Sequence, residues 1–84
     1  MNSAHRRTLA LIFSRPTRSN IRWSDIESLI IGLGGRVEER AGSRVVIRLN
    51  GLVSVFHRPH PRPDTAKAAV DAMRVFLINA DAAP

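Results

Sequence analysis

The chain has 84 residues, a length that fits one small domain with a thin core. Hydrophobic residues make up 44% of the chain, too many for a disordered protein, and the absence of cysteine excludes disulfides and thiolate metal sites. The net charge is +6, and all but one of the 13 basic residues are arginine, whose planar guanidinium matches phosphate. This excess of positive charge favours a polyanionic partner, and nucleic acid is a better candidate than an acidic protein. The alternative is that the arginines reflect a compositional bias and lie on a solvated surface.

A first helix is predicted over residues 3–14, capped by Ser3. Its apolar stripe consists of Leu9, Ile12 and Phe13. We expect His5, one turn earlier, to be an exposed surface residue rather than a ligand. Two arginines before this short apolar run resemble the start of a signal sequence, but Pro16 interrupts the run too early. No run reaches the roughly 18 apolar residues that span a bilayer, so we expect a cytoplasmic protein without a membrane segment.

A second helix follows Trp23, which we expect to be a packing anchor rather than a base-stacking residue. Ser24 and Glu27 fit a capping box at its start, and Gly34-Gly35 ends it. Its buried stripe is predicted to be Ile26, Leu29, Ile30 and Leu33. The next segment, 36–40, is a short charged strand, and its charges suit a sheet edge or a sheet with one wet face.

Asn50-Gly51 separates two apolar-rich runs, 44–49 and 52–57, and predicts a hairpin because a type I′ turn needs positive φ at both central residues. A two-residue turn sets Arg44 opposite His57. The core face then takes Val45, Ile47, Leu49, Leu52 and Phe56. The other face takes Arg44, Val46, Arg48, Val53, Val55 and His57. An arginine directly across from a histidine on an open sheet face is the one local arrangement that indicates chemistry.

The segment 57–62 is proline-rich and extended, and Asp64 or Thr65 is predicted to cap a final helix. The apolar stripe of this helix is Ala66, Ala69, Val70, Met73, Phe76 and Leu77. The order of elements predicts a single α+β domain over residues 1–84, with two layers, a three-stranded antiparallel sheet and helices on one face. Without the first helix, α-β-β-β-α is the order of a double-stranded-RNA-binding domain.

Residues 21–80 resemble the HicA toxin family in their order of helix, glycine pair, charged strand, Gly42-Ser43, hairpin, proline-and-histidine segment and closing helix. The resemblance implies a metal-independent, cofactor-free endonuclease that cleaves messenger RNA and is neutralised by a HicB-type antitoxin. The family usually carries a catalytic histidine directly after Gly-Ser, where this chain has Arg44, and His60 resembles a second recurring histidine. The departure leaves two interpretations: nuclease chemistry in a displaced position, or a non-catalytic RNA- or protein-binding module on the same fold.

Metal-free RNA cleavage needs a base, an acid for the leaving oxygen and a cation beside the developing negative charge. We predict His57 as base or acid, Arg44 as phosphate clamp, and His60 as second proton carrier or positioning group. The arginines predicted to track the RNA backbone are Arg40, Arg48, Arg58 and Arg62. The alternative is that both histidines are surface residues at a rigid turn. Two histidines without cysteine supply half a metal site, so no metal is predicted.

Three valines, Val46, Val53 and Val55, are expected among the arginines of the outer sheet face. Exposed apolar patches often mark interfaces, so this face would suit capture by an antitoxin. The alternative is that the first helix folds over part of the same face.

Overall fold

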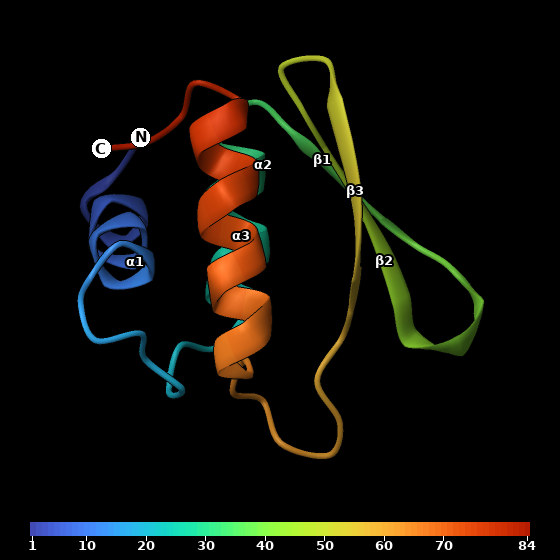
Figure 1. Cartoon of the computed structure of the whole chain (residues 1–84). Helices are drawn as coiled ribbons and strands as arrows, with labels where there is room; N and C mark the ends of the chain where they lie inside the picture. Colours follow the sequence, from blue (N-terminus) through green and yellow to red (C-terminus); the bar gives the residue numbers. More distant parts are fainter.

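The computed structural model describes all 84 residues as three helices and one antiparallel sheet (Figure 1). The helices are α1 (Ser3–Ile12), α2 (Trp23–Gly32) and α3 (Lys67–Asn79). The strands are β1 (Arg36–Glu39), β2 (Arg44–Leu49) and β3 (Leu52–His57), in that order across the sheet, and a short 3-10 turn, η1 (Ala41–Ser43), joins β1 to β2. The predicted α+β fold, with a three-stranded antiparallel sheet and helices on one face, is confirmed.

The helix α1 packs against α2 and α3 on the side that faces away from the sheet (Figure 1). Figure 1 shows α2 and α3 between α1 and the sheet. α1 contacts α2 and α3, while α2 contacts β1 and α3 contacts β3. The outer face of the sheet therefore carries no helix, and the alternative in which the first helix covers it is wrong. None of the three helices combines the length and apolar character that crossing a membrane requires.

The hairpin has the predicted register. Asn50 and Gly51 have φ of +50° and +83°, and β2 pairs with β3 from Leu49 opposite Leu52 to Arg44 opposite His57. The predicted core-face residues are buried, except for half-buried Leu52. On the outer face Val53 and Val55 are more than half exposed. Val46 was expected to be exposed as well but is buried, because it lies in the central strand between Glu38 and Val55.

A short backbone bridge joins the start of α2 to the segment before α3. Arg22 pairs with Asp64, the Trp23 N–H donates to the Pro63 carbonyl (3.0 Å), and the Thr65 N–H donates to the Ile21 carbonyl (2.8 Å). α2 begins at Trp23, directly after the bridge, and α3 begins at Lys67, two residues after Thr65, so both helices start beside this contact between distant segments. The predicted side-chain caps are correspondingly absent from α2 and α3.

The predicted caps are wrong at all three helices. The α1 cap is Asn2, whose side chain accepts from the His5 N–H (2.8 Å). The caps of α2 and α3 are Arg22 and Ala66, neither with a side-chain capping bond. Glu27, predicted for the capping box, instead accepts from the indole N–H of Trp23 (2.7 Å).

The helix α1 rests on α2 through His5, which is half-buried rather than exposed as predicted. Its Nε2 lies 3.0 Å from the hydroxyl of Ser28, and its ring occupies the space that a Cβ on Gly32 would need. Trp23 is confirmed as a packing anchor, 3% exposed with its ring centroid 5.7 Å from that of Phe56. Gly34, with φ of +91°, turns the chain out of α2 as predicted.

Candidate nucleic-acid interface

Three arginines on the outer face share a single carboxylate. Glu38, in the middle of β1, accepts from Arg48 Nε (2.9 Å), Arg40 Nη2 (3.1 Å) and Arg36 Nη2 (3.4 Å). The hydrogen bond from Arg48 is the largest cause that lowers the pKa of Glu38, and the charges of the three arginines add to it. We call these four residues the Glu38 cluster. One negative charge cannot neutralise three positive ones, so the cluster retains a net positive charge.

Arg44 and His57 form the last pair of the hairpin, and both are exposed on the same face. The next pair along is joined by a backbone bond from Arg58 N–H to the Ser43 carbonyl (2.8 Å). Hydrogen-bonded and open pairs alternate, so Arg44 and His57 form an open pair, with Cβ atoms roughly 4.5–5.5 Å apart. Arg44 Nε donates to the Ala41 carbonyl (3.0 Å), and no carboxylate pairs with its guanidinium.

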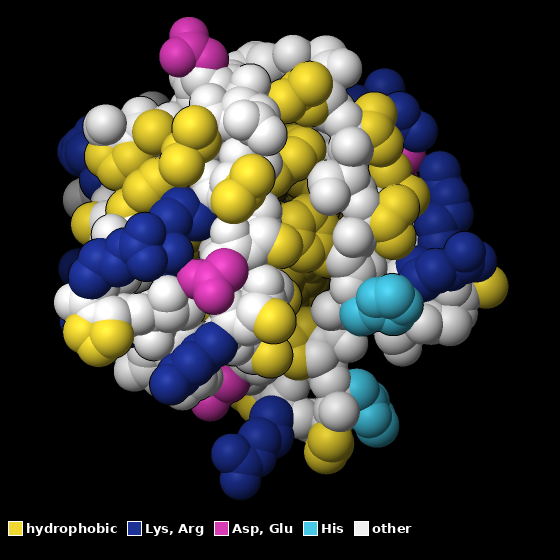
Figure 2. All heavy atoms as spheres, in the orientation of Figure 1, with side chains coloured by type: hydrophobic (Ala, Val, Ile, Leu, Met, Phe, Trp, Pro, Cys, Tyr) yellow, Lys and Arg dark blue, Asp and Glu magenta, His cyan; other side chains and the backbone are white.

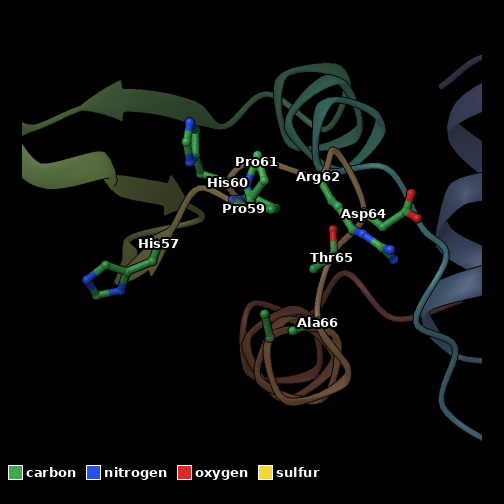
Figure 3. A pocket seen from close by; sticks show the side chains of 9 residues that line it. His57, Pro59, His60, Pro61, Arg62, Asp64, Thr65 and Ala66 are labelled. Carbon is green, nitrogen blue, oxygen red and sulfur yellow. The ribbon is translucent and has the colours of Figure 1, made fainter.

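The two predicted catalytic histidines line one cavity without converging. His57 and His60 both line a cavity of about 350 Å³, whose other lining residues belong to the proline-rich segment and the start of α3. In Figure 3 the two rings point in different directions, and Arg62 extends away from both, on the side of Asp64. The structure thus brings the predicted residues into one neighbourhood, with the side chains of His57, His60 and Arg62 directed apart.

Arg58 lies on the inner side of the same segment and is half-buried. It forms ion pairs with Glu39 and with Glu27 (3.3 Å), and the hydrogen bond to Glu39, followed by that to Glu27, raises its pKa. These contacts link the segment to α2 and β1. Because both carboxylates engage its guanidinium, we leave Arg58 out of the candidate RNA surface.

The predicted backbone-tracking arginines therefore separate into three environments. Arg40 and Arg48 belong to the Glu38 cluster, Arg58 is held by two carboxylates, and Arg62 lines the same cavity as His57 and His60. Sequence reasoning missed Arg36 as a member of the outer face. The period-2 alternation of β1 places Arg36 on the same face as Glu38 and could have identified it.

The histidines and carboxylates are spread over the surface, and no group of three or more His, Asp or Glu side chains is placed to hold a metal ion. Comparison with protein-family models, curated proteins and solved structures finds no match to this chain. The resemblance to HicA toxins rests on the residues quoted for it and stays a prediction.

Proposed function

We propose that this chain binds RNA on the outer face of its sheet and cleaves it without a metal at His57. The observation that carries the proposal is the pairing of Arg44 with His57, which sets a guanidinium without a carboxylate partner beside an exposed imidazole. An imidazole can take or give a proton near neutral pH, and a guanidinium stabilises negative charge on phosphate.

Binding would come from the surplus positive charge on this face. The Glu38 cluster has three arginines for one carboxylate, and Arg44 adds a fourth cation at the end of the same two strands. Contacts between arginine and phosphate dominate RNA affinity and are independent of base sequence. We therefore expect weakly selective binding that falls as salt rises.

The cleavage step assigns one proton transfer to His57. The ribose 2′-oxygen attacks phosphorus and loses its proton to the imidazole, and the bond to the 5′-oxygen breaks as that oxygen takes a proton from water. The hydroxide that remains takes the proton from the imidazolium, which returns His57 to its neutral form. Arg44 stabilises the charge that develops on the phosphate oxygens. Figure 3 shows the His60 ring directed away from that of His57, which favours a positioning role for His60 over direct proton transfer.

The test is cleavage of a labelled RNA by the purified chain with a chelator present. We expect cleavage products from the wild type and a rate roughly 100-fold lower for His57→Ala, because general acid–base groups contribute about that much or more. RNA affinity should stay nearly unchanged in this variant. Lys67→Ala, an exposed cation at the start of α3, is the control and should cleave like the wild type. Equal rates for His57→Ala and wild type would reject the assignment.

The second candidate is a non-catalytic RNA- or protein-binding module. The divergent directions of the His57 and His60 rings favour it, as does Arg44 in the position where the resembled family has a histidine. The same assay separates the two candidates. Bound RNA that stays intact at every pH between 5 and 9 would support the module and reject the nuclease.

The family resemblance extends the proposal to the toxin of a toxin–antitoxin pair, neutralised by a HicB-type antitoxin. The exposed Val53 and Val55 among the arginines would be part of the contact with that partner. Expression should arrest growth, and coexpression of the neighbouring gene should relieve the arrest. Normal growth of cells that accumulate the folded chain would contradict the toxin role.

A further inference from the structure

The two edges of the sheet differ in how well they are protected. β1 forms one edge and carries charged residues of both signs, whereas β3 forms the other edge. From Leu52 to Phe56, β3 has no charged residue and no proline, and its pairing with β2 runs through six residues without a bulge. Natural proteins protect exposed edges with charges, prolines or bulges, and an edge without them is a template for another strand.

The backbone groups on the free edge of β3 belong to alternate residues. Arg58 N–H bonds to the Ser43 carbonyl, so the alternation of an antiparallel ladder directs Leu52, Ser54 and Phe56 toward β2. The N–H and C=O groups of Val53, Val55 and His57 consequently point outward. None of these three residues takes part in a backbone hydrogen bond outside the regular elements.

The surface next to this edge carries no charged side chain, and most of the residues that line it are hydrophobic. A groove of about 320 Å³ separates β3 from α3. It is lined by Leu52, Val53, Ser54, Ala72, Val75, Phe76 and Asn79. On α3, a stripe of small and apolar exposed residues continues the groove outward, formed by Ala68, Ala72 and Val75. Figure 2 shows hydrophobic side chains filling the strip between α3 and β3, with the lysine and arginine side chains at its sides.

We propose that this face binds the same face of a second copy of the chain, with β3 paired antiparallel to β3. Two chains with a net charge of +6 repel each other, and the uncharged strip is where they can approach without bringing cations together. A twofold axis perpendicular to the sheet also keeps the helices of both copies on the same side. The stripe on α3 then faces the stripe of the second copy, and the small side chains of Ala68 and Ala72 allow close approach.

The outward backbone groups set the register of this pairing. When Val55 lies opposite Val55 of the second copy, Val53 lies opposite His57, and all three outward residues of each strand form about six hydrogen bonds across the axis. Each residue stays opposite one from the same face, as a continuous sheet requires. The result is a six-stranded sheet in which the outer faces of the two copies form one surface.

Sedimentation equilibrium of the full chain without RNA, from micromolar to millimolar concentration, tests the dimer directly. We expect a monomer–dimer equilibrium that Val55→Lys weakens at least 10-fold, because two lysines would meet at the axis. Val75→Lys tests the helix side of the same face and should also weaken it. Ile31→Lys is the matched control, because Ile31 is a 60% exposed residue on α2, and it should dimerise like the wild type.

Nuclear Overhauser effects between differently labelled copies test the register. Pairing centred on Val55 brings the α-protons of Ser54 and Phe56 of opposite copies together. A chain that stays monomeric at millimolar concentration, or equal dimerisation of all three lysine variants, would overturn the proposal. These measurements use neither RNA nor cleavage. The dimer can therefore be rejected while the proposed function holds, and the proposed function can be rejected while the dimer holds.

Discussion

Two groups of arginines in this small chain are arranged in opposite ways. Arg74, in α3, is one buried cation with three acceptors: the Ile12 carbonyl (3.0 Å), Asp71 (2.9 Å) and the Thr17 hydroxyl (3.3 Å). The Glu38 cluster is one carboxylate with three exposed cations. A cation with a surplus of acceptors is held in place by the fold. Cations that share one acceptor keep charge available for a ligand.

The position of Arg74 explains why the fold needs it. Ile12 is the last residue of α1, where carbonyls lack helical partners and the helix dipole favours a positive charge. Through this bond Arg74 fastens α1 to α3, and Asp71 also accepts from Thr17 in the connector (2.8 Å). The three arginines of the Glu38 cluster are exposed, and ion pairs of exposed side chains contribute little to stability and are screened by salt.

Replacing Arg74 should therefore produce the largest effect. We expect Arg74→Met to lower the free energy of unfolding by roughly 2–4 kcal/mol, because it leaves the Ile12 carbonyl without its partner and removes a buried charged hydrogen bond. Urea unfolding monitored by Trp23 fluorescence measures this loss. Lys67→Met, on the exposed side of the same helix, should change stability by less than about 0.5 kcal/mol. Equal losses of stability in the two variants would show that Arg74 has no special structural role.

Removing two cations from the outer face should have the next largest effect. We expect Arg44→Ala with Arg48→Ala to weaken RNA binding about 10-fold and to reduce the slope of log affinity against log salt by about 1.4. Arg15→Ala with Lys67→Ala removes the same charge from exposed positions outside the sheet. If this control pair weakens binding equally, RNA responds to net charge and not to the sheet face.

The difference between local and long-range contacts decides which features of the fold could be predicted from the sequence. The hairpin, its register and the Arg44–His57 pair depend on a two-residue turn and a period of two, which are local signals in residues 44–57. The starts of α2 and α3 lie beside the bridge between Arg22 and Asp64, a contact between distant segments that no local pattern contains. Arg74 is a similar case, since its acceptor at Ile12 lies 62 residues away.

Only the part of the candidate site that lies on paired strands could be predicted from the sequence. Arg44 and His57 are placed by the turn, so their shared exposed face followed from the residues alone. The directions of His60 and Arg62 depend on a proline-rich segment outside regular structure, and the structure turns them apart. The role of Glu38 required the register between β1 and β2, because Arg48 reaches it from the neighbouring strand.

Neutralising the shared carboxylate should have a smaller effect in the opposite direction. Glu38→Gln leaves three arginines without a counter-charge, so we expect RNA affinity at low salt to rise about 2- to 3-fold. Asp25→Asn, on the first turn of α2, removes the same charge away from the sheet and serves as the control. A rise of the same size in both variants would show that net charge, and not the cluster, governs binding.

The smallest expected effect is the pH dependence of stability that Glu38 confers. Its arginine partners lower the pKa of the Glu38 carboxyl in the folded chain relative to the unfolded chain. The ionised group therefore stabilises the fold at pH values above its unfolded pKa, and this contribution disappears as the pH falls through the lowered, folded pKa. The urea midpoint of the wild type should exceed that of Glu38→Gln slightly at pH 7, and the difference should shrink progressively as the pH falls below the ordinary glutamate pKa of 4.5. The Gln variant cannot titrate at this position, so a difference that does not shrink with falling pH would mean that Glu38 acts through packing rather than charge.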